Sequence, residues 1–381
     1  MGYVYKIINR KKRVLTILAD GLFNLMTFPV RLFTKKNKPI CPEDIKQILL
    51  IRTAYIGDVI MTLPMLKPLK ERFSNASIVF LTSSGGREIV LNNPYVDDIL
   101  AYEPFWFYEG SFIEYLKFLG QLRKRSFDLV IEARADIRDI LFLVFPSRSR
   151  AKLSYDVGGG GCFLSHVVPF EKVKHKVEYH LDLARFLECD TSVLRWGVYT
   201  TAAEKKEVEQ LLARNGVSTP FICVHPGSRL HLKRWPLDRC ASLYDRMIEK
   251  FGLPLVILGS GSELEIVNEV VALMKNRPVM LAGKTSIRQL YEVIAKAQLL
   301  ICNDSAPMHM AAAAGTPTVA IFGPSKSIET GPYGTRFRVV EKDCPYRMNC
   351  DESVCNNRLY HECMQSITPD DVYEAVSEIL T

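Results

Sequence analysis

Long apolar runs, internal repeats and low-complexity segments are all absent from this sequence. The longest apolar stretch, residues 14–30, falls short of the roughly 20 residues that a membrane-spanning helix needs, and it is interrupted by Asp20, Gly21, Asn24 and Pro29. The absence of a fixed repeat period excludes a solenoid. The 381 residues, of which 48% are hydrophobic and 24% charged, are typical of a folded globular protein with room for two domains.

A basic excess is also absent from the main body of the chain. Residues 1–40 hold nine of the 49 Lys and Arg residues but only one of the 42 acidic residues, Asp20. The remainder therefore has 40 basic and 41 acidic residues. A nucleic-acid-binding domain carries its own basic patch, so the neutral body argues against nucleic acid as a partner.

Residues 1–40 interleave their positive charge with large apolar side chains. This pattern predicts an amphipathic helix that lies in the plane of a membrane surface and is attracted by anionic lipid on the cytoplasmic face. A helix packed on the body of the protein and a short membrane span are the two alternatives. No small-residue cleavage site follows the apolar stretch, so a cleaved signal peptide is not expected.

From about residue 46 onward, short apolar runs alternate with helical stretches. Continuous apolar runs are typical of strands that are buried on both faces of a parallel sheet. Five such strands are predicted in each half, at 48–51, 78–81, 99–102, 129–131 and 151–155, and at 221–224, 255–258, 279–281, 299–302 and 318–322. The predicted fold class is α/β, with two Rossmann-like doubly wound domains that face a central cleft.

Four segments follow from this pattern. Residues 1–40 form a basic amphipathic N-terminal arm, 41–200 a first Rossmann-like domain, and 201–366 a second Rossmann-like domain. The last segment, 367–381, is expected to form a helix that crosses back to the first half.

Asp58 is the first residue with a chemical role to consider. It follows the first predicted strand and begins a helix, at the carboxyl edge of the sheet where ligands of open α/β folds bind. Capping a helix N-terminus is the commonest role of an aspartate in this position. The alternative is that Asp58 acts as a general base.

Two loops in the second half suit a nucleotide. Gly227 and Ser228 offer exposed backbone N–H groups and a hydroxyl after the first strand, and Lys233 and Arg234 bring cations to the same loop. This combination suits a pyrophosphate, with a solvated basic loop as the alternative. After the next strand, Glu263 ends a Gly-Ser-Gly-Ser-Glu sequence and is placed either to hold ribose hydroxyls or only to cap its helix.

The most specific stretch is 302–317, with the sequence CNDSAPMHMAAAAGTP. Asp304, Ser305 and Ala306 form a turn that presents hydroxyl and backbone donors at a helix N-terminus. His309 lies one turn into that helix, close enough to share an anion site. A histidine within a helix is by default a packed one, but its position near the N-terminus favours the ligand-binding interpretation.

Four of the ten cysteines gather near the C-terminus, at Cys344, Cys350, Cys355 and Cys363. Four thiols within 20 residues can bind zinc, but the paired Cys-x-x-Cys spacing is absent. Free thiols, a zinc site and disulfides therefore stay open as interpretations, and none is given a catalytic role. The six scattered cysteines are typical of small buried hydrophobic residues in a reducing compartment.

The four stretches around Asp58, Ser228, Glu263 and Asp304 resemble, in this order, the heptosyltransferase-like glycosyltransferase family 9. The resemblance runs from about Lys46 to the C-terminus. The resemblance implies a GT-B fold, inversion at the anomeric carbon, no required metal or other cofactor, and Asp58 as general base. It also implies a set of residues that bind the donor: Ser228, Lys233, Glu263, Asp304, Ser305, Ala306 and His309. The long basic arm departs from the family, whose best-known members begin close to the first strand.

The resemblance predicts an inverting glycosyltransferase that moves a sugar, heptose from ADP-heptose, onto a lipopolysaccharide core or a related glycan. The alternatives are an O-antigen or capsule glycosyltransferase with another sugar nucleotide, a sugar-nucleotide epimerase, and a non-catalytic membrane-associated binding protein. An acidic or phosphorylated acceptor, or simple surface solubility, would explain the cations of the first half, among them Arg87, Arg134, Arg138 and Lys174.

Three partners are expected on this interpretation. They are the nucleotide sugar, a lipid-linked glycan acceptor and, through residues 1–40, the surface of the inner membrane. The expected location is therefore the cytoplasm, peripheral on the inner face of the bacterial inner membrane.

Overall fold

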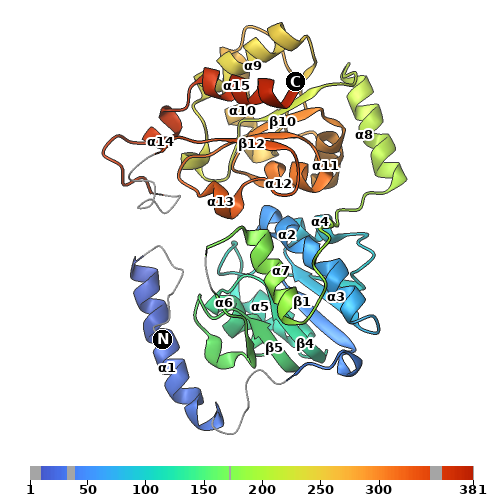
Figure 1. The fold of residues 1–381 in the computed structure, drawn as a ribbon, viewed down its shortest axis with the longest axis vertical. Helices are drawn as coiled ribbons and strands as arrows, with labels where there is room; N and C mark the ends of the chain where they lie inside the picture. The colour runs from blue at the N-terminus through green and yellow to red at the C-terminus, as the bar shows by residue number, and fades with distance from the viewer. Residues whose placement is uncertain (1–9, 32–38, 171–172, 344–353, 381) are drawn as a thin grey trace. The chain divides into compact units, whose positions relative to one another are not determined.

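The computed structural model describes residues 10–31, 39–170, 173–343 and 354–380. The chain divides into two compact units, one up to Gly197 and one from Val198 onward (Figure 1). Each unit contains one six-stranded sheet with helices packed against it. The predicted α/β class with two Rossmann-like units is confirmed.

The first sheet has the strand order β3-β2-β1-β4-β5-β6, and every pair of neighbours is parallel. Its strands are β1 Gln47–Ile51, β2 Ser77–Thr82, β3 Asp98–Ala101, β4 Phe127–Glu132, β5 Ser149–Ser154 and β6 His166–Val167. This order reverses between β1 and β4, which is the topological switch point where ligands bind in such sheets.

Helices and short turns connect these strands. The helices are α1 Arg10–Arg31, α2 Ile56–Thr62, α3 Leu66–Arg72, α4 Ser84–Val90, α5 Phe112–Leu122, α6 Ile137–Asp139 and α7 Lys176–Phe186. The turns are η1 Pro42–Asp44, η2 Leu63–Met65, the π-helical η3 Ile140–Val144 and η4 Gly161–Phe163. Alternate residues of β1 face opposite sides: Leu49 and Ile51 pack in a cluster with Phe118 of α5, while Ile48 and Leu50 are equally buried. Both faces of the sheet are therefore covered, which explains its continuous apolar runs.

The second sheet repeats the topology of the first, with the order β12-β11-β10-β7-β8-β9 and parallel neighbours. Its strands are β7 Ile222–His225, β8 Leu255–Ile257, β9 Val279–Met280, β10 Leu299–Asn303, β11 Thr318–Ile321 and β12 Phe337–Val340. The switch point lies between β7 and β10.

Helices and short turns also connect the strands of the second sheet. They are α8 Ala202–Arg214, α9 Leu237–Phe251, α10 Leu264–Leu273, α11 Ile287–Lys296, α12 Ala306–Ala314, α13 Ser327–Thr330, α14 Glu362–Gln365 and α15 Pro369–Leu380, with 3₁₀ turns η5 His231–Lys233 and η6 Gly261–Glu263. Gly315 ends α12 in the left-handed conformation at φ 76°, which a glycine adopts without strain.

Each sheet has six strands, whereas the sequence predicted five in each half, so one strand of each sheet was missed. The first, β6, is only two residues long and lies at the sheet edge. The second, β12, is an edge strand whose first two residues, Phe337 and Arg338, are exposed. Neither carries the continuous apolar run that identifies an interior strand.

The last helix, α15, packs its buried face against α9, β11 and β12 of its own unit. Val372, Ala375, Val376 and Ile379 are spaced as one helical stripe and are part of the second unit's core. This apolar stripe therefore packs at the edge of the second sheet, where β12 lies.

The N-terminal helix α1 runs without a break through the residues that interrupt its apolar stretch. Asn24 stays helical and donates from its side chain to the Asp20 carbonyl at 2.8 Å, and Thr27 donates likewise to the Phe23 carbonyl at 2.8 Å. Among the described parts of the chain, no helix is both long enough and apolar enough to cross a membrane.

Candidate active site

The first candidate site lies where β1 ends and α2 begins. Asp58 is the third residue of α2, and its Oδ2 accepts a hydrogen bond from the backbone N–H of Tyr55 at 3.4 Å. Asp58 therefore caps the helix, which was one of the two interpretations of the sequence. Its side chain remains 15% exposed, so that the capping role leaves the carboxylate accessible to a ligand.

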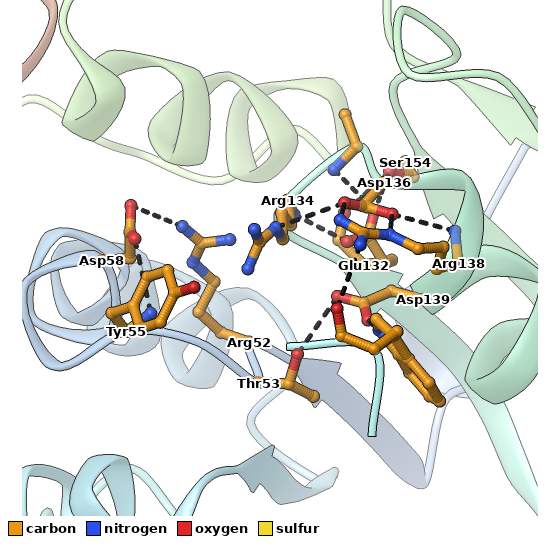
Figure 2. Close-up of polar contacts among 12 residues, drawn as sticks. Arg52, Thr53, Tyr55, Asp58, Glu132, Arg134, Asp136, Arg138, Asp139 and Ser154 are labelled. Atoms are coloured by element: carbon orange, nitrogen blue, oxygen red, sulfur yellow. Dashed lines mark hydrogen bonds and ion pairs between the residues drawn. The ribbon is translucent and has the colours of Figure 1, made fainter. Parts of the chain in front are cut away.

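Cations surround this carboxylate. Asp58 Oδ1 lies 2.6 Å from Nη2 of Arg52 and 3.3 Å from Nζ of Lys176 (Figure 2 shows the Arg52 contact). Burial raises the pKa of Asp58, but the charges of Arg52, Lys176 and Arg134 outweigh burial and hold that pKa well below its usual value. Asp58 is consequently ionised at neutral pH and available to accept a proton.

Arg52 has more donors than partners. The guanidinium is 4% exposed, and neither its Nε nor its Nη1 has a hydrogen-bond partner among the described residues. Figure 2 shows it between Asp58 and Arg134, whose own Nη1 also has no partner within the described chain. Arg134 lies over the ring of Phe107, 3.7 Å from the centroid. Two cations side by side with unused donors favour an anionic group bound between them.

The other first-half cations are engaged differently. Arg138 pairs with Asp136 at 2.7 Å and lies over the same Phe107 ring, so it belongs to this cluster. Arg87 contacts the neighbouring Glu88 at 3.5 Å on an exposed surface, and Lys174 pairs with Asp182. Of these four cations, Arg134 therefore lies beside Arg52, and Arg138 shares the Phe107 ring with Arg134.

Beneath the cluster, β4 ends in a fully buried carboxyl group, Glu132. It accepts hydrogen bonds from the backbone N–H groups of Arg134 and Ala135, each at 2.8 Å. Ala135 has a left-handed φ of 61°, so these bonds hold a turn that most side chains avoid. Burial, together with the buried carboxyl of Asp139, raises the pKa of Glu132 to about 8. Glu132 thus positions the backbone that carries Arg134.

We expect Glu132→Gln to flatten the pH dependence of stability. A carboxyl whose folded pKa of about 8 lies above the unfolded value of 4.5 stabilises the fold below pH 4.5, and that contribution is lost as the pH rises through 8. The wild-type free energy of unfolding should therefore fall between pH 5 and pH 8 by on the order of a few kcal/mol more than that of the variant.

Denaturant unfolding at several pH values measures this difference. Glu71→Gln is the matched control, because Glu71 lies in the same unit with 59% of its side chain exposed. Equal slopes for wild type and Glu132→Gln would show that Glu132 does not titrate as the structure indicates.

The second candidate site lies at the carboxyl ends of three neighbouring strands of the second sheet. The strands β8, β7 and β10 are adjacent, and the loops that follow them carry the seven residues predicted to bind the donor: Ser228, Lys233, Glu263, Asp304, Ser305, Ala306 and His309. The structure brings these loops into direct contact, as the following bonds show.

A buried ion pair joins two of the loops. Lys233 Nζ donates to Asp304 Oδ2 at 2.8 Å, with 14% and 7% of the two side chains exposed. Burial raises the pKa of Asp304, but Lys233 outweighs burial and lowers it. Ser228 is 3% exposed and its hydroxyl donates to the Asp304 carbonyl at 3.1 Å. This hydroxyl therefore joins the loop after β7 to the loop after β10.

Glu263 is part of a second contact between loops. Its Oε2 accepts from the backbone N–H of Ser260 at 2.8 Å and lies 3.4 Å from Nε2 of His225. The other ring nitrogen of His225 lies 3.2 Å from Oγ of Ser305. A Cβ on Gly227 would lie 2.1 Å from Oε1 of Glu263, so any larger residue there would displace this carboxylate. Glu263 therefore caps η6 and also lies beside the strand ends.

Ala306 and His309 lie on α12. Ala306 is the first residue of this helix, so its backbone is at the positive end of the helix dipole. His309, the fourth residue of the helix, is 6% exposed and contributes to lowering the pKa of Asp304. The two residues therefore lie at the edge where Lys233 and Ser305 are found.

Three residues of these sites escaped sequence analysis. Lys176 lies 118 residues from Asp58 in the chain, and nothing local indicates the pairing. His225 is the last residue of β7, and its position at the carboxyl end of a strand was itself an indication of a ligand-binding residue. Arg52 follows β1 directly and offered the same indication.

The cysteine cluster extends beyond the described residues. Cys344 and Cys350 lie outside them, while Cys355 is half-buried and Cys363 is buried. Within the described ranges, no three His, Cys, Asp or Glu side chains gather as a metal site would require. Of the scattered cysteines, five are buried and Cys41 is exposed, and burial raises the pKa of the Cys240 thiol to about 12.

Comparison with known sequences decides the family. The sequence model of glycosyltransferase family 9 (heptosyltransferase) matches residues 115–361, more than half of the chain. The chain belongs to glycosyltransferase family 9. A curated relative, lipooligosaccharide heptosyltransferase 2 of Campylobacter jejuni, is 26% identical over 337 residues, which are 86% of this chain and 97% of the relative.

Solved structures agree on the fold of this family 9 member. A family 9 glycosyl transferase from Veillonella parvula superimposes with a TM-score of 0.77 at 22% identity, over 89% of this chain and 98% of the other. The Escherichia coli ADP-heptose lps heptosyltransferase II superimposes with a TM-score of 0.70 at 24% identity, over 88% and 98%. The family 9 chain therefore has the GT-B fold and is a glycosyltransferase, so the epimerase and the non-catalytic binding protein are no longer needed as explanations.

Proposed function

We propose that this enzyme transfers heptose from ADP-heptose onto a lipopolysaccharide core or a related glycan, with inversion at the anomeric carbon. The observation that carries the proposal is an ionised, partly accessible carboxylate, Asp58, at the switch point of the first sheet. The names of its relatives support the choice of heptose as the sugar, and the E. coli structure supports ADP-heptose as the donor.

In the proposed reaction, Asp58 accepts the proton of an acceptor hydroxyl. The hydroxyl oxygen forms a bond to the anomeric carbon from the face opposite the nucleotide, and the bond from that carbon to the β-phosphate oxygen breaks. ADP leaves with the electron pair of that bond. The low pKa of Asp58 makes it a weak base in the ground state. Asp58 therefore accepts the proton during the attack, when the acceptor hydroxyl becomes more acidic.

On the donor side, we assign the diphosphate to the loops that carry Lys233 and the N-terminus of α12. Asp304 holds the Lys233 ammonium in place, and Ser228, Ser305, Ala306 and His309 line the same site. Glu263 is assigned to the ribose hydroxyls. The cation and the helix dipole stabilise the charge that develops on ADP. No metal or other cofactor has a step in this proposal, and the late cysteines have none.

On the acceptor side, we assign an acidic group to the guanidinium pair of Arg52 and Arg134. Their unpaired N–H donors suit a carboxylate or a phosphate. An acceptor that is a lipid-linked glycan would place the enzyme in the cytoplasm, at the inner face of the bacterial inner membrane.

A transfer assay tests the proposal. Purified enzyme is incubated with ADP-heptose and lipopolysaccharide-core acceptors, and ADP release and product are followed by chromatography and NMR. We expect ADP release to depend on acceptor, and the new glycosidic bond to have the anomeric configuration opposite to that of the donor. Retention of configuration, or donor consumption without acceptor, would contradict it.

A second candidate uses the same site. An O-antigen or capsule glycosyltransferase would differ in its sugar nucleotide. Thermal shift across a panel of sugar nucleotides separates the two: stabilisation by ADP-heptose supports our assignment, and stabilisation by another sugar nucleotide alone supports the alternative.

A further inference from the structure

The N-terminal helix α1 exposes an unusual amount of apolar surface. Eight of its large hydrophobic side chains are between 43% and 73% exposed: Val14, Leu15, Ile17, Leu18, Leu22, Leu25, Met26 and Phe28. Most soluble helices bury such residues against their own domain. Large contiguous exposed apolar patches mark sites of interaction with proteins or membranes.

The opposite side of α1 is held by its own unit. Asp20 is 5% exposed, and its Oδ1 accepts a hydrogen bond from the backbone N–H of Gly160 at 2.8 Å. Phe23 packs edge-on against Phe163 with 5.3 Å between ring centroids. The exposed apolar side chains are therefore not the face by which α1 packs on its unit. That face carries Asp20 and Phe23 and is already in contact.

The docked and the exposed sides of α1 also differ in charge. Asp20 is the sole acidic residue among the first 40, and it is used in the docking contact. Lys11 and Arg13 of α1 are exposed, and seven further Lys or Arg residues belong to the same 40 residues. The surface that α1 presents to solvent thus combines apolar side chains with cations and carries no carboxylate.

The loop that Asp20 contacts also lies against the turn that carries Arg134. The loop that receives Asp20 contains Gly158, where a Cβ would lie 1.7 Å from the carbonyl oxygen of Ala135. Ala135 stands in the turn that carries Arg134 and Asp136. Beside the loop, Phe145 is 52% exposed and packs on Phe163 with 4.6 Å between ring centroids. An exposed aromatic side chain of the unit that carries Asp58 therefore lies beside the place where α1 docks.

We propose that α1 is an in-plane helix that binds the surface of an anionic bilayer. In this arrangement the apolar side chains enter the boundary between headgroups and acyl chains while the lysines and arginines contact anionic headgroups. The inference deepens the proposed function, on which it rests for the lipid-linked acceptor, by naming the surface that presents it. A second copy of the helix is a poorer occupant, because two segments of charge +8 repel one another.

Co-sedimentation with vesicles tests this inference without turnover, so a failure of the proposed reaction would not affect the result. Full-length protein is mixed with vesicles of phosphatidylcholine alone or of phosphatidylcholine with phosphatidylglycerol. We expect binding to the anionic vesicles that weakens as salt is added. The double variant Leu18→Glu, Leu25→Glu replaces two leucines that are 65% and 73% exposed, and should bind more than about tenfold more weakly.

Two comparisons keep the test decisive. Leu273→Glu changes a leucine of the second unit that is 55% exposed, and should bind like wild type. Asp20→Ala loses the docking contact but keeps the apolar side, so it should still bind anionic vesicles. Equal binding by wild type and the Leu18, Leu25 variant would overturn the inference. So would a wild-type dimer in light scattering that this variant converts to a monomer, because a second copy would then cover the helix.

Discussion

Replacement of Asp58 by Asn is expected to reduce kcat by about 10²–10⁴-fold while leaving donor affinity within a factor of about two. The amide keeps the size of the side chain and can still accept the Tyr55 hydrogen bond, but it cannot take up the acceptor proton. Steady-state transfer rates and a separate titration of ADP-heptose measure the two quantities.

The matched control for this variant is Asp97→Asn. Asp97 lies in the same unit, pairs with Lys70 at 2.8 Å and also has a lowered pKa. It should retain the activity of the wild type, because it lies at the amino end of its own strand and not beside Arg52. If Asp58→Asn kept full activity, a different group would have to be the base, and the proposed mechanism would be wrong.

Replacement of Lys233 by Met is expected to cost about 3–5 kcal/mol of folding free energy and to weaken donor binding about 10–100-fold. The variant leaves the Asp304 carboxylate buried without its cation. Its stability loss should be largest at neutral pH. Removing the cation raises the pKa of Asp304, so the carboxyl is protonated as the pH falls and the penalty shrinks.

Two further variants separate folding from binding. Lys296→Met removes an exposed pair with Glu209 at 2.9 Å, where 27% and 61% of the side chains are exposed, and should cost about 0–1 kcal/mol. The double variant Lys233→Met, Asp304→Asn should recover much of the stability of wild type, because no buried charge remains, but not its donor affinity. Denaturant unfolding and calorimetric titration measure both, and recovery of donor affinity in the double variant would remove Lys233 from the donor site.

The general architecture could be predicted because it depends on local patterns. Interior strands such as β1 and β10 are continuous apolar runs, since both of their faces are covered by helices. The helix α9 depends on a local pattern as well, because its apolar side recurs with helical period and Gly252 ends it. Edge elements such as β6 and β12 lack such patterns and were missed.

The candidate sites divide in the same way. Asp58, Glu263 and the turn at Asp304 were found because each follows a predicted strand, and strand ends meet at one edge of a parallel sheet. The chemical state of those residues was beyond prediction. The lowered pKa of Asp58 depends on Arg52 and on Lys176, 118 residues after it, and the lowered pKa of Asp304 depends on Lys233, 71 residues before it.

By itself, then, the sequence determined the strands, the helices and the loops in which chemistry could occur, because period and capping act over a few residues. The tertiary structure alone decided which of those residues touch: Lys176 with Asp58, His225 with Glu263 and Ser305, and Asp20 with Gly160, 140 residues away. Such pairings depend on sheet order and on the path of whole elements. No local pattern encodes either of these, and for that reason the docked face of α1 and the apolar face it leaves exposed became visible only in the folded chain.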